Sequence, residues 1–261
     1  MTTPKENFTI SPQEHARLSR KLSDLEVAMS TFDVRVECLT NFQDFRDTAR
    51  QIPHRKEITA VYDIRQCDIG PNNGFWIKAS DEHGQLVHIQ AMRFDDLNET
   101  SLSQHWLESP SMFAPAGYQV VLEKCNFDTA PASHRINGKV CYHGDFWLDA
   151  SYRKLDLAPL LSKYSTLQAL LKFEPDYIYG LVPPTLIERG WAARQGYLHM
   201  HPWAPRWYIE GQKEFYDDYL VWITGPELLS LWTAGERDID VLSRINIAHN
   251  NGRSVAKYVR S

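Results

Sequence analysis

The spacing of apolar residues alternates along the chain between a helical period and a period of two, which predicts a mixed domain of helices and strands. Apolar residues at helical spacing after Ser11-Pro12 predict a helix, and short apolar runs bounded by turn residues are typical of strands. The expected helices cover residues 11–30, 42–49, 102–107, 155–171 and 185–196. The expected strands cover residues 32–39, 74–80, 86–94, 118–127, 139–149, 176–182, 197–209 and 219–224.

One stretch, from Gly144 to Leu161, indicates a ligand site. An apolar and aromatic run ends in a polar turn, and a leucine-rich helix follows directly. The first N–H groups of a helix have no partner within the helix, so a strand that leads straight into a helix places free donors at the carboxyl end of the strand. An anion can bind there.

The same stretch resembles a known motif. Residues 152–161 are similar to the acyl-CoA pyrophosphate loop of the GNAT N-acyltransferase superfamily, which reads Arg or Gln, two residues, Gly, one residue, then Gly or Ala. Arg153 and Ala158 fit the two ends, and Asp156 stands in place of the middle glycine. The sequence at 194–197 resembles the Gly-aromatic turn of the superfamily. The order of expected elements over residues 32–225 is also similar to that of the superfamily.

The resemblance implies an α/β (α+β) fold: a GNAT-like mixed, mostly antiparallel central sheet flanked by helices. The strands near 139–149 and 176–182 are then expected to be parallel neighbours that diverge at their carboxyl ends. The domains expected are an N-terminal helical extension (1–31), a GNAT-like acyltransferase domain (32–225, with an insertion at about 98–133) and a C-terminal helical tail (226–261). The tail predicts two short helices, one with Leu228, Leu229 and Leu231 and one with Val241, Leu242, Ile245 and Ile247.

The chemistry implied is transfer of an acyl group from acyl-CoA, as cosubstrate, to an amine of a small molecule or peptide. A backbone N–H near residues 146–148 would polarise the thioester oxygen, main-chain groups of Leu148 and Asp149 would follow the pantetheine, and residues 153–158 would face the pyrophosphate. The expected CoA-binding residues are Phe146, Trp147, Leu148, Asp149, Arg153, Lys154, Leu155, Asp156, Leu157 and Ala158.

The expected catalytic base lies on the central strand, where Tyr142, His143 and Asp145 are candidates. Strand alternation places His143 and Asp145 on one face, with Cys141 and Trp147, and Tyr142 on the other. The alternative is that His143 is a hydrogen-bonded histidine of the sheet. The tyrosine that often serves the superfamily as general acid corresponds here to Ala192, and its frequent asparagine corresponds to Thr185, which is expected to cap a helix.

Composition limits the partners. The net charge of −5 disfavours nucleic acid, which a basic face would attract, and no apolar run is long enough to cross a membrane. The N-terminal residues do not resemble a signal peptide, so a cytoplasmic protein with free cysteines is expected. His199 and His201 could share a strand face, but with no third ligand in the sequence no metal is expected. The N-terminal helix could pack on the domain or form a homodimer.

Two other functions remain open. The loop without glycine suits a GNAT-fold transferase that uses an acyl carrier protein or another non-CoA donor, because acyl-phosphopantetheine lacks the adenosine pyrophosphate. Aminoacyl-tRNA is disfavoured as donor by the acidic balance. Asp156, Leu155 and Ala192 together would also suit a non-catalytic GNAT-fold binding module. The main expectation is an acyltransferase that transfers groups other than aminoacyl groups.

Overall fold

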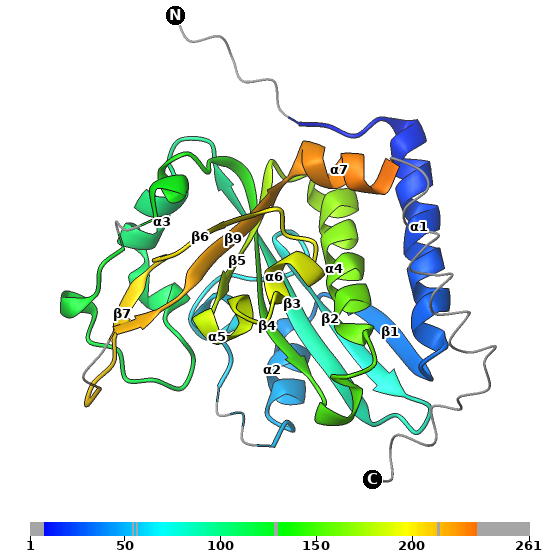
Figure 1. Ribbon diagram of the computed structural model, residues 1–261, viewed down its shortest axis with the longest axis horizontal. Coiled ribbons are helices and arrows are strands. Elements are labelled where there is room, and N and C mark those ends of the chain that lie inside the picture. Colours follow the sequence, from blue (N-terminus) through cyan, green and yellow to red (C-terminus); the bar gives the residue numbers. More distant parts are fainter. Residues whose placement is uncertain (1–7, 54, 56, 128–129, 213–214, 234–261) are drawn as a thin grey trace, which may run out of the picture.

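Seven strands form one sheet in the computed structural model, which describes residues 8–53, 55, 57–127, 130–212 and 215–233 (Figure 1). The strand order is β1-β2-β3-β4-β5-β9-β6, and only β4 and β5 pair in parallel. The strands are β1 (Val34–Leu39), β2 (Gly74–Asp81), β3 (Leu86–Leu97), β4 (Gly138–Leu148), β5 (Tyr177–Val182), β6 (His199–His201) and β9 (Tyr219–Thr224). β7 (Arg206–Tyr208) and β8 (Phe215–Asp217) form a separate hairpin. This mostly antiparallel sheet confirms the predicted fold class.

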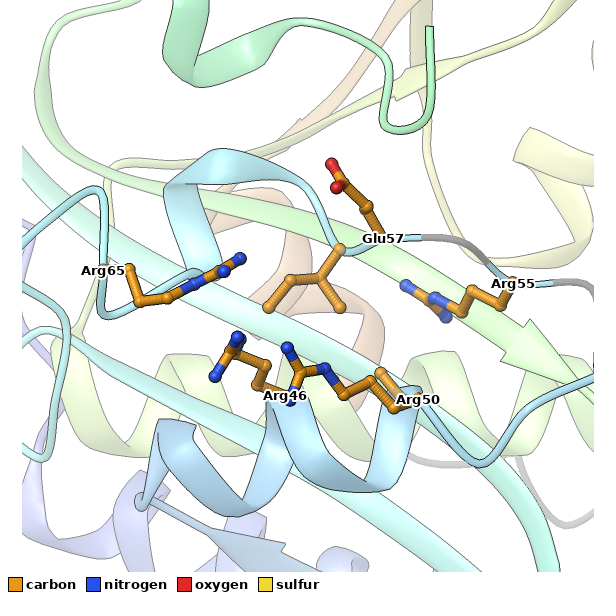
Figure 2. Close-up of a pocket in the computed structure, with 7 residues that line it drawn as sticks. Arg46, Arg50, Arg55, Glu57 and Arg65 are labelled. Carbon is orange, nitrogen blue, oxygen red and sulfur yellow. The ribbon is translucent and has the colours of Figure 1, made fainter.

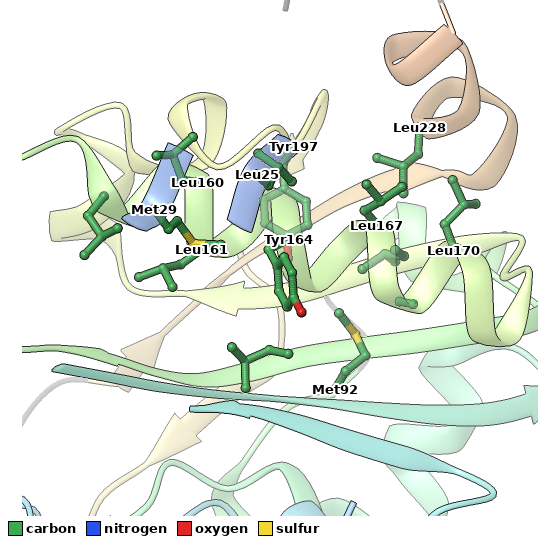
Figure 3. Close-up of a cluster of buried hydrophobic side chains, with 14 of the residues drawn as sticks. Leu25, Met29, Met92, Leu160, Leu161, Tyr164, Leu167, Leu170, Tyr197 and Leu228 are labelled. Carbon is green, nitrogen blue, oxygen red and sulfur yellow. The ribbon is translucent and has the colours of Figure 1, made fainter. Parts of the chain in front are cut away.

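Two apolar cores lie on the two faces of the sheet. The first, here called the α4 face, is covered by α1 (Pro12–Ser30), α4 (Leu157–Phe173), α5 (Pro184–Ile187), α6 (Trp191–Arg194) and α7 (Gly225–Thr233) (Figure 3). The second, the α2 face, is covered by α2 (Phe42–Ala49), α3 (Leu102–Glu108) and the chain between β3 and β4. Both faces are therefore buried, which suits the nearly continuous apolar residues of β5 and β9.

Helix α1 is part of the main core. Ser11 caps it through a reciprocal capping box with Glu14, and Pro12 occupies its first turn, as the sequence indicates. Leu18 and Met29 are completely buried in the core that includes the leucines of α4. In Figure 1, α1 and α4 lie side by side along the sheet. The predicted N-terminal helix is confirmed.

The connection from β4 through α4 to β5 is a parallel crossover. Pairing between the two strands covers only residues 140–142 and 177–179, although β4 continues to Leu148 and β5 to Val182. The prediction that these strands are parallel neighbours that separate toward their carboxyl ends is confirmed.

Three predicted elements differ from the structure. Residues 118–127 form a 3₁₀ turn and two isolated bridges rather than a strand. The strand expected at 197–209 is interrupted after His201 by Pro202 and by Trp203 with φ 58°, and its second part pairs with β8 instead of the main sheet. A single helix at 185–196 is also wrong, because Gly190 adopts φ 69° between two one-turn helices.

Thr185 does not cap a helix. α5 begins at Pro184 with Pro183 as its N-cap residue, and no side chain caps it, so Thr185 lies inside the first turn. At the C-terminal end, α7 confirms the first predicted helix of the tail, whereas the second, at residues 241–247, lies outside the described residues. Within the described part of the chain, no helix is long and apolar enough to cross a membrane.

We expect Gly138→Ala to lower the free energy of unfolding by about 2–4 kcal/mol. Gly138 begins β4 with φ 83°, and a Cβ there would lie 2.3 Å from Oδ2 of Asp176. That carboxylate accepts from the Lys139 N–H at 2.8 Å, so it cannot retreat without breaking the start of β4. Urea unfolding measures the change.

The matched control is Gly84→Ala, because Gly84 has φ 76° but no atom within 4 Å of the added carbon. Its substitution should cost only about 1 kcal/mol, the strain of a left-handed residue. Equal losses in the two variants would contradict the proposed collision with Asp176.

Candidate functional site

A bulge in β4 defines the place where β4 and β5 separate. Ile89 pairs with Trp147 and Ala91 with Gly144, so two residues of β4, Asp145 and Phe146, oppose the single residue Gln90. Asp145 has φ 53°, the left-handed conformation that allows the extra residue. An extra residue reverses the alternation of side chains beyond it.

The prediction that His143 and Asp145 share a face is therefore wrong. His143 lies on the α4 face, where it contacts Tyr197 and Gln90. Asp145 turns to the α2 face, as does Trp147, and Tyr142 lies there too. The physical reason is the bulge, because strict alternation assumes one residue for each position of the ladder.

His143 is held in a buried chain of hydrogen bonds. The Gln90 side-chain N–H donates to the carbonyl of Leu161 at 2.6 Å, which turns its Oε1 toward Nε2 of His143 at 2.7 Å. In this arrangement Nε2 carries the proton, and Nδ1 accepts from the Tyr197 hydroxyl at 2.8 Å. Burial lowers the pKa of His143 to about 4. The imidazole is therefore neutral near pH 7, with both nitrogens occupied.

Asp145 and Tyr142 are also engaged. The carboxylate of Asp145 accepts from the hydroxyl of Thr59 at 2.7 Å and from its N–H at 3.1 Å, and it pairs with Arg55 at 3.0 Å. Burial, and after it the charge of Asp145, raises the pKa of Tyr142 well above its ordinary value. A phenol that stays protonated at neutral pH cannot accept a proton from an ammonium group.

Asp218 is a residue that the sequence analysis missed. It is 6% exposed, and burial followed by the charge of Asp217 raises its pKa to about 7. The charges of Asp145 and Asp218 both raise the pKa of Tyr142. Tyr142 therefore lies within electrostatic reach of both carboxylates. The available signal was an acidic pair, Asp217-Asp218, directly before the buried strand β9.

The strand registers place Asp218 just beyond the bulge. Tyr142 pairs with Tyr179, and Asp145 and Phe146 share one position of the ladder, so continuing that register brings Trp147 level with Pro183. Val182 pairs with Tyr219, so the next step brings Pro183 level with Asp218. β5 ends at Val182. Beyond that residue no strand lies between β4 and the start of β9 in the described part of the sheet. Two regular strand spacings are about 10 Å, and the separation of β4 from β5 makes the gap at this level wider than that. On the β5 side, the backbone groups of β4 beyond Tyr142 have no strand partner among the described residues.

The turn after β4 contains a left-handed residue at the middle position of the motif. Asp156 is the N-cap residue of α4 and adopts φ 53°, a conformation that favours glycine. Its carboxylate pairs with Arg194 of α6 at 2.8 Å, and it does not cap α4. The negative charge of Asp156, which would repel a nearby phosphate, is therefore paired with a guanidinium.

Two of the expected pantetheine contacts are occupied. Nε of Arg153 donates to the carbonyl of Leu148 at 3.0 Å, and the N–H of Asp149 donates to Val87 of β3 at 2.9 Å. Neither group is free for a ligand in this conformation. Phe146 is half-buried between the rings of His88 and Trp191, at centroid distances of 4.6 and 5.8 Å.

The other residues of the predicted pyrophosphate loop differ in their solvent exposure. Lys154 is exposed, Leu155 and Ala158 are half-buried, and Leu157 is completely buried in the core of the α4 face. The N–H of Leu155 donates to the carbonyl of Tyr152 at 3.2 Å. The first N–H groups of α4 have no partner within the helix, so Leu157 and Ala158 supply the donors, with the charge of Lys154 nearby.

The paired histidines of β6 have other partners. His199 is 2.7 Å from Glu227, and Nδ1 of His201 is 2.6 Å from the carbonyl of Pro202. Within the residues that the structure describes, no group of three or more His, Cys, Asp or Glu side chains is placed to hold a metal ion.

Three features decide the architecture: the strand order, the single parallel pair of strands, and the separation of that pair next to the start of α4. The fold is GNAT-like. No protein-family model matches the sequence, and no curated protein does. Similar solved structures include NAA60 from Arabidopsis thaliana in complex with acetyl-CoA, with 15% identity, 73% of this chain and 98% of that chain covered, and a TM-score of 0.43.

Two further structures are similar. Dodecameric spermidine N-acetyltransferase from Vibrio cholerae has 9% identity, with 78% of this chain and 99% of that chain covered and a TM-score of 0.45. FeeM, an N-acyl amino acid synthase from uncultured soil microbes, has 11% identity, with 84% and 90% covered and a TM-score of 0.33.

Proposed function

We propose that the chain is an acyl-CoA-dependent N-acyltransferase that moves an acyl group from a thioester to an amine of a small molecule or peptide. The observation that carries the proposal is the separation of β4 from β5 at a bulge, with the first turn of α4 just beyond it. Unpaired backbone donors beside a helix N-terminus suit a thioester carbonyl and an adjacent phosphate.

In this proposal the roles of the predicted residues are revised. A β4 N–H within residues 146–148 polarises the thioester oxygen, and Asp218, level with Trp147 across the missing strand position, accepts the ammonium proton of the acceptor. A carboxylate with a pKa of about 7 is suited to this step, because the ideal pKa of a general base lies near the working pH. His143 positions β4 through Gln90 and Tyr197 instead of acting as the base.

We expect Asp156→Gly to tighten CoA binding about 5- to 10-fold, which corresponds to about 1 kcal/mol. Glycine accepts the left-handed φ of this position without strain, and the change removes a negative charge beside the phosphates. Arg194→Ala is the control of opposite sign, because it leaves Asp156 with an uncompensated charge and should weaken binding. Calorimetry with CoA measures both. Unchanged binding in both variants would place the pyrophosphate away from Asp156.

The function is tested by incubating the protein with acetyl-CoA, longer acyl-CoAs or acyl-phosphopantetheine, together with a panel of amines. Released thiol and the mass of the acylated amine are measured. Acylation that depends on acyl-CoA supports the proposal. Acylation from acyl-phosphopantetheine alone would favour a carrier-protein donor, and acylation from neither donor, without CoA binding, would favour a binding module.

A further inference from the structure

Four arginines line a small pocket on the α2 face of the molecule. Arg46 belongs to α2, Arg50 is the C-cap residue of that helix, and Arg55 and Arg65 follow in the connection to β2. Figure 2 shows their guanidinium groups gathered around one space. The cavity has a volume of about 80 Å³, and its remaining lining residues are Ala49, Ile58 and Glu57. It is large enough for an anionic group of a few atoms, since a water occupies about 30 Å³ of liquid.

The carboxylates that hold these arginines do not line the pocket. Asp63 accepts hydrogen bonds from Arg65, which lower its pKa to about 2, and its Oδ1 lies 3.9 Å from Nε of Arg46. Asp145 pairs with Arg55. The only acidic residue in the lining is Glu57, which is exposed. Arg50 lies 3.6 Å from Asp47, which is also outside the lining. The arginines are thus paired with carboxylates behind the pocket, and the lining itself holds four basic side chains and one acidic one.

Arg46 is fixed at the back of the pocket. Its side chain is 13% exposed, and its buried Nε lies beside Asp63, outside the lining. Guanidinium groups that gather around one space repel each other. A carboxylate or phosphate between them lowers that repulsion, because its oxygens accept paired hydrogen bonds from planar guanidinium groups.

The pocket adjoins the proposed reaction centre. Arg55 reaches from its lining to Asp145, the bulge residue next to Phe146. Resting on the proposed function, we propose that the arginine pocket binds an anionic group, a carboxylate or a phosphate, of the acceptor amine. The acceptor is then an amino acid or a phosphorylated amine, held by its anionic end while its nitrogen lies beside β4.

Binding is tested without catalysis by titrating the protein with inorganic phosphate and with succinate at constant ionic strength, using calorimetry. We expect binding of at least one of them, weakened 10-fold or more in Arg46→Gln and Arg50→Gln. Arg35→Gln is the matched control, because Arg35 is 83% exposed on the edge strand β1 and should bind as the wild type does. Binding of neither anion, or equal binding in all variants, would overturn the proposal, whatever the outcome for acyl transfer.

Acceptor choice is tested by comparing amino acids with their amides and phosphorylated amines with their alcohols. We expect the anionic member of a pair to have a kcat/KM at least 10-fold higher. Arg50→Gln should remove that preference while the KM for acetyl-CoA stays unchanged. Acyl transfer that prefers neutral amines would overturn the arginine assignment and leave the proposed function intact. Anion binding without any acyl transfer would overturn the proposed function alone.

Discussion

Asp218→Asn lowers the turnover of acyl transfer by about 10²-fold or more, the contribution of a positioned general base. The amide occupies the same space but cannot accept a proton from the ammonium group. CoA affinity stays near that of the wild type, because the loop that faces the pyrophosphate follows β4, whereas Asp218 precedes β9. Steady-state kinetics at saturating acyl-CoA measure the loss.

The pH dependence separates a base from a structural role. Because the pKa of Asp218 is about 7, wild-type kcat/KM rises with pH through about 7 as the carboxylate ionises. The Asp218→Asn variant loses this rise of kcat/KM with pH. Asp217→Asn is the neighbouring control, because it keeps the base. Asp217 raises the pKa of Asp218, so in this variant the rise of kcat/KM moves to lower pH. Full turnover in Asp218→Asn would assign the proton transfer to another group.

The free energy of unfolding falls between pH 6.5 and about 4, and Asp218 limits the fall. Burial lowers the pKa of His143 to about 4 and that of His88 to about 3, from 6.5. The unfolded chain therefore binds more protons in this range, so the stability from each neutral histidine is complete above pH 6.5 and is lost as the pH falls. Asp218 acts in the opposite sense, because its pKa rises from 3.8 to about 7 and the folded state takes up its proton first.

The three histidines whose pKa values the fold lowers, His88, His105 and His143, outweigh the one opposing aspartate, so the free energy of unfolding of the wild type falls as the pH falls. In Asp218→Asn the opposing contribution disappears, and the slope steepens by about 1 kcal/mol per pH unit. Urea unfolding at pH 6.5 and 5.0 measures both slopes. His83→Ala, which removes an exposed imidazole, should leave them unchanged. Equal slopes in the wild type and in Asp218→Asn would show that Asp218 is an ordinary solvated carboxylate.

The sequence predicts correctly those helices and strands whose capping residues and apolar patterns agree with how they pack. Ser11, Pro12 and Glu14 begin α1 as their residue types predict, and the bounds of α2 and β9 coincide with the apolar pattern. The parallel pair was expected from the resemblance and from the helix between the two strands, which makes a crossover. These features depend on residues close together in the chain.

The site was predicted less completely because it depends on distant residues. The bulge at Asp145 is stabilised by Thr59 and Arg55, which come from a segment about 90 residues earlier. Without that contact, simple alternation assigns Asp145 to the wrong face. The raised pKa of Asp218 comes mainly from burial against other parts of the fold and secondly from the charge of Asp217. The partner of Asp156, Arg194, also lies beyond the reach of a local pattern.

A crystal structure of the protein with a thioether analogue of acyl-CoA tests the proposed acyl-transfer site directly. We expect the acyl carbonyl where β4 and β5 separate, with its oxygen accepting from a β4 N–H within residues 146–148. We also expect the pyrophosphate at the first turn of α4 and Asp218 facing the carbonyl from the side of β9. An analogue bound elsewhere, or no binding at millimolar concentration, would contradict the proposed acyl-transfer site.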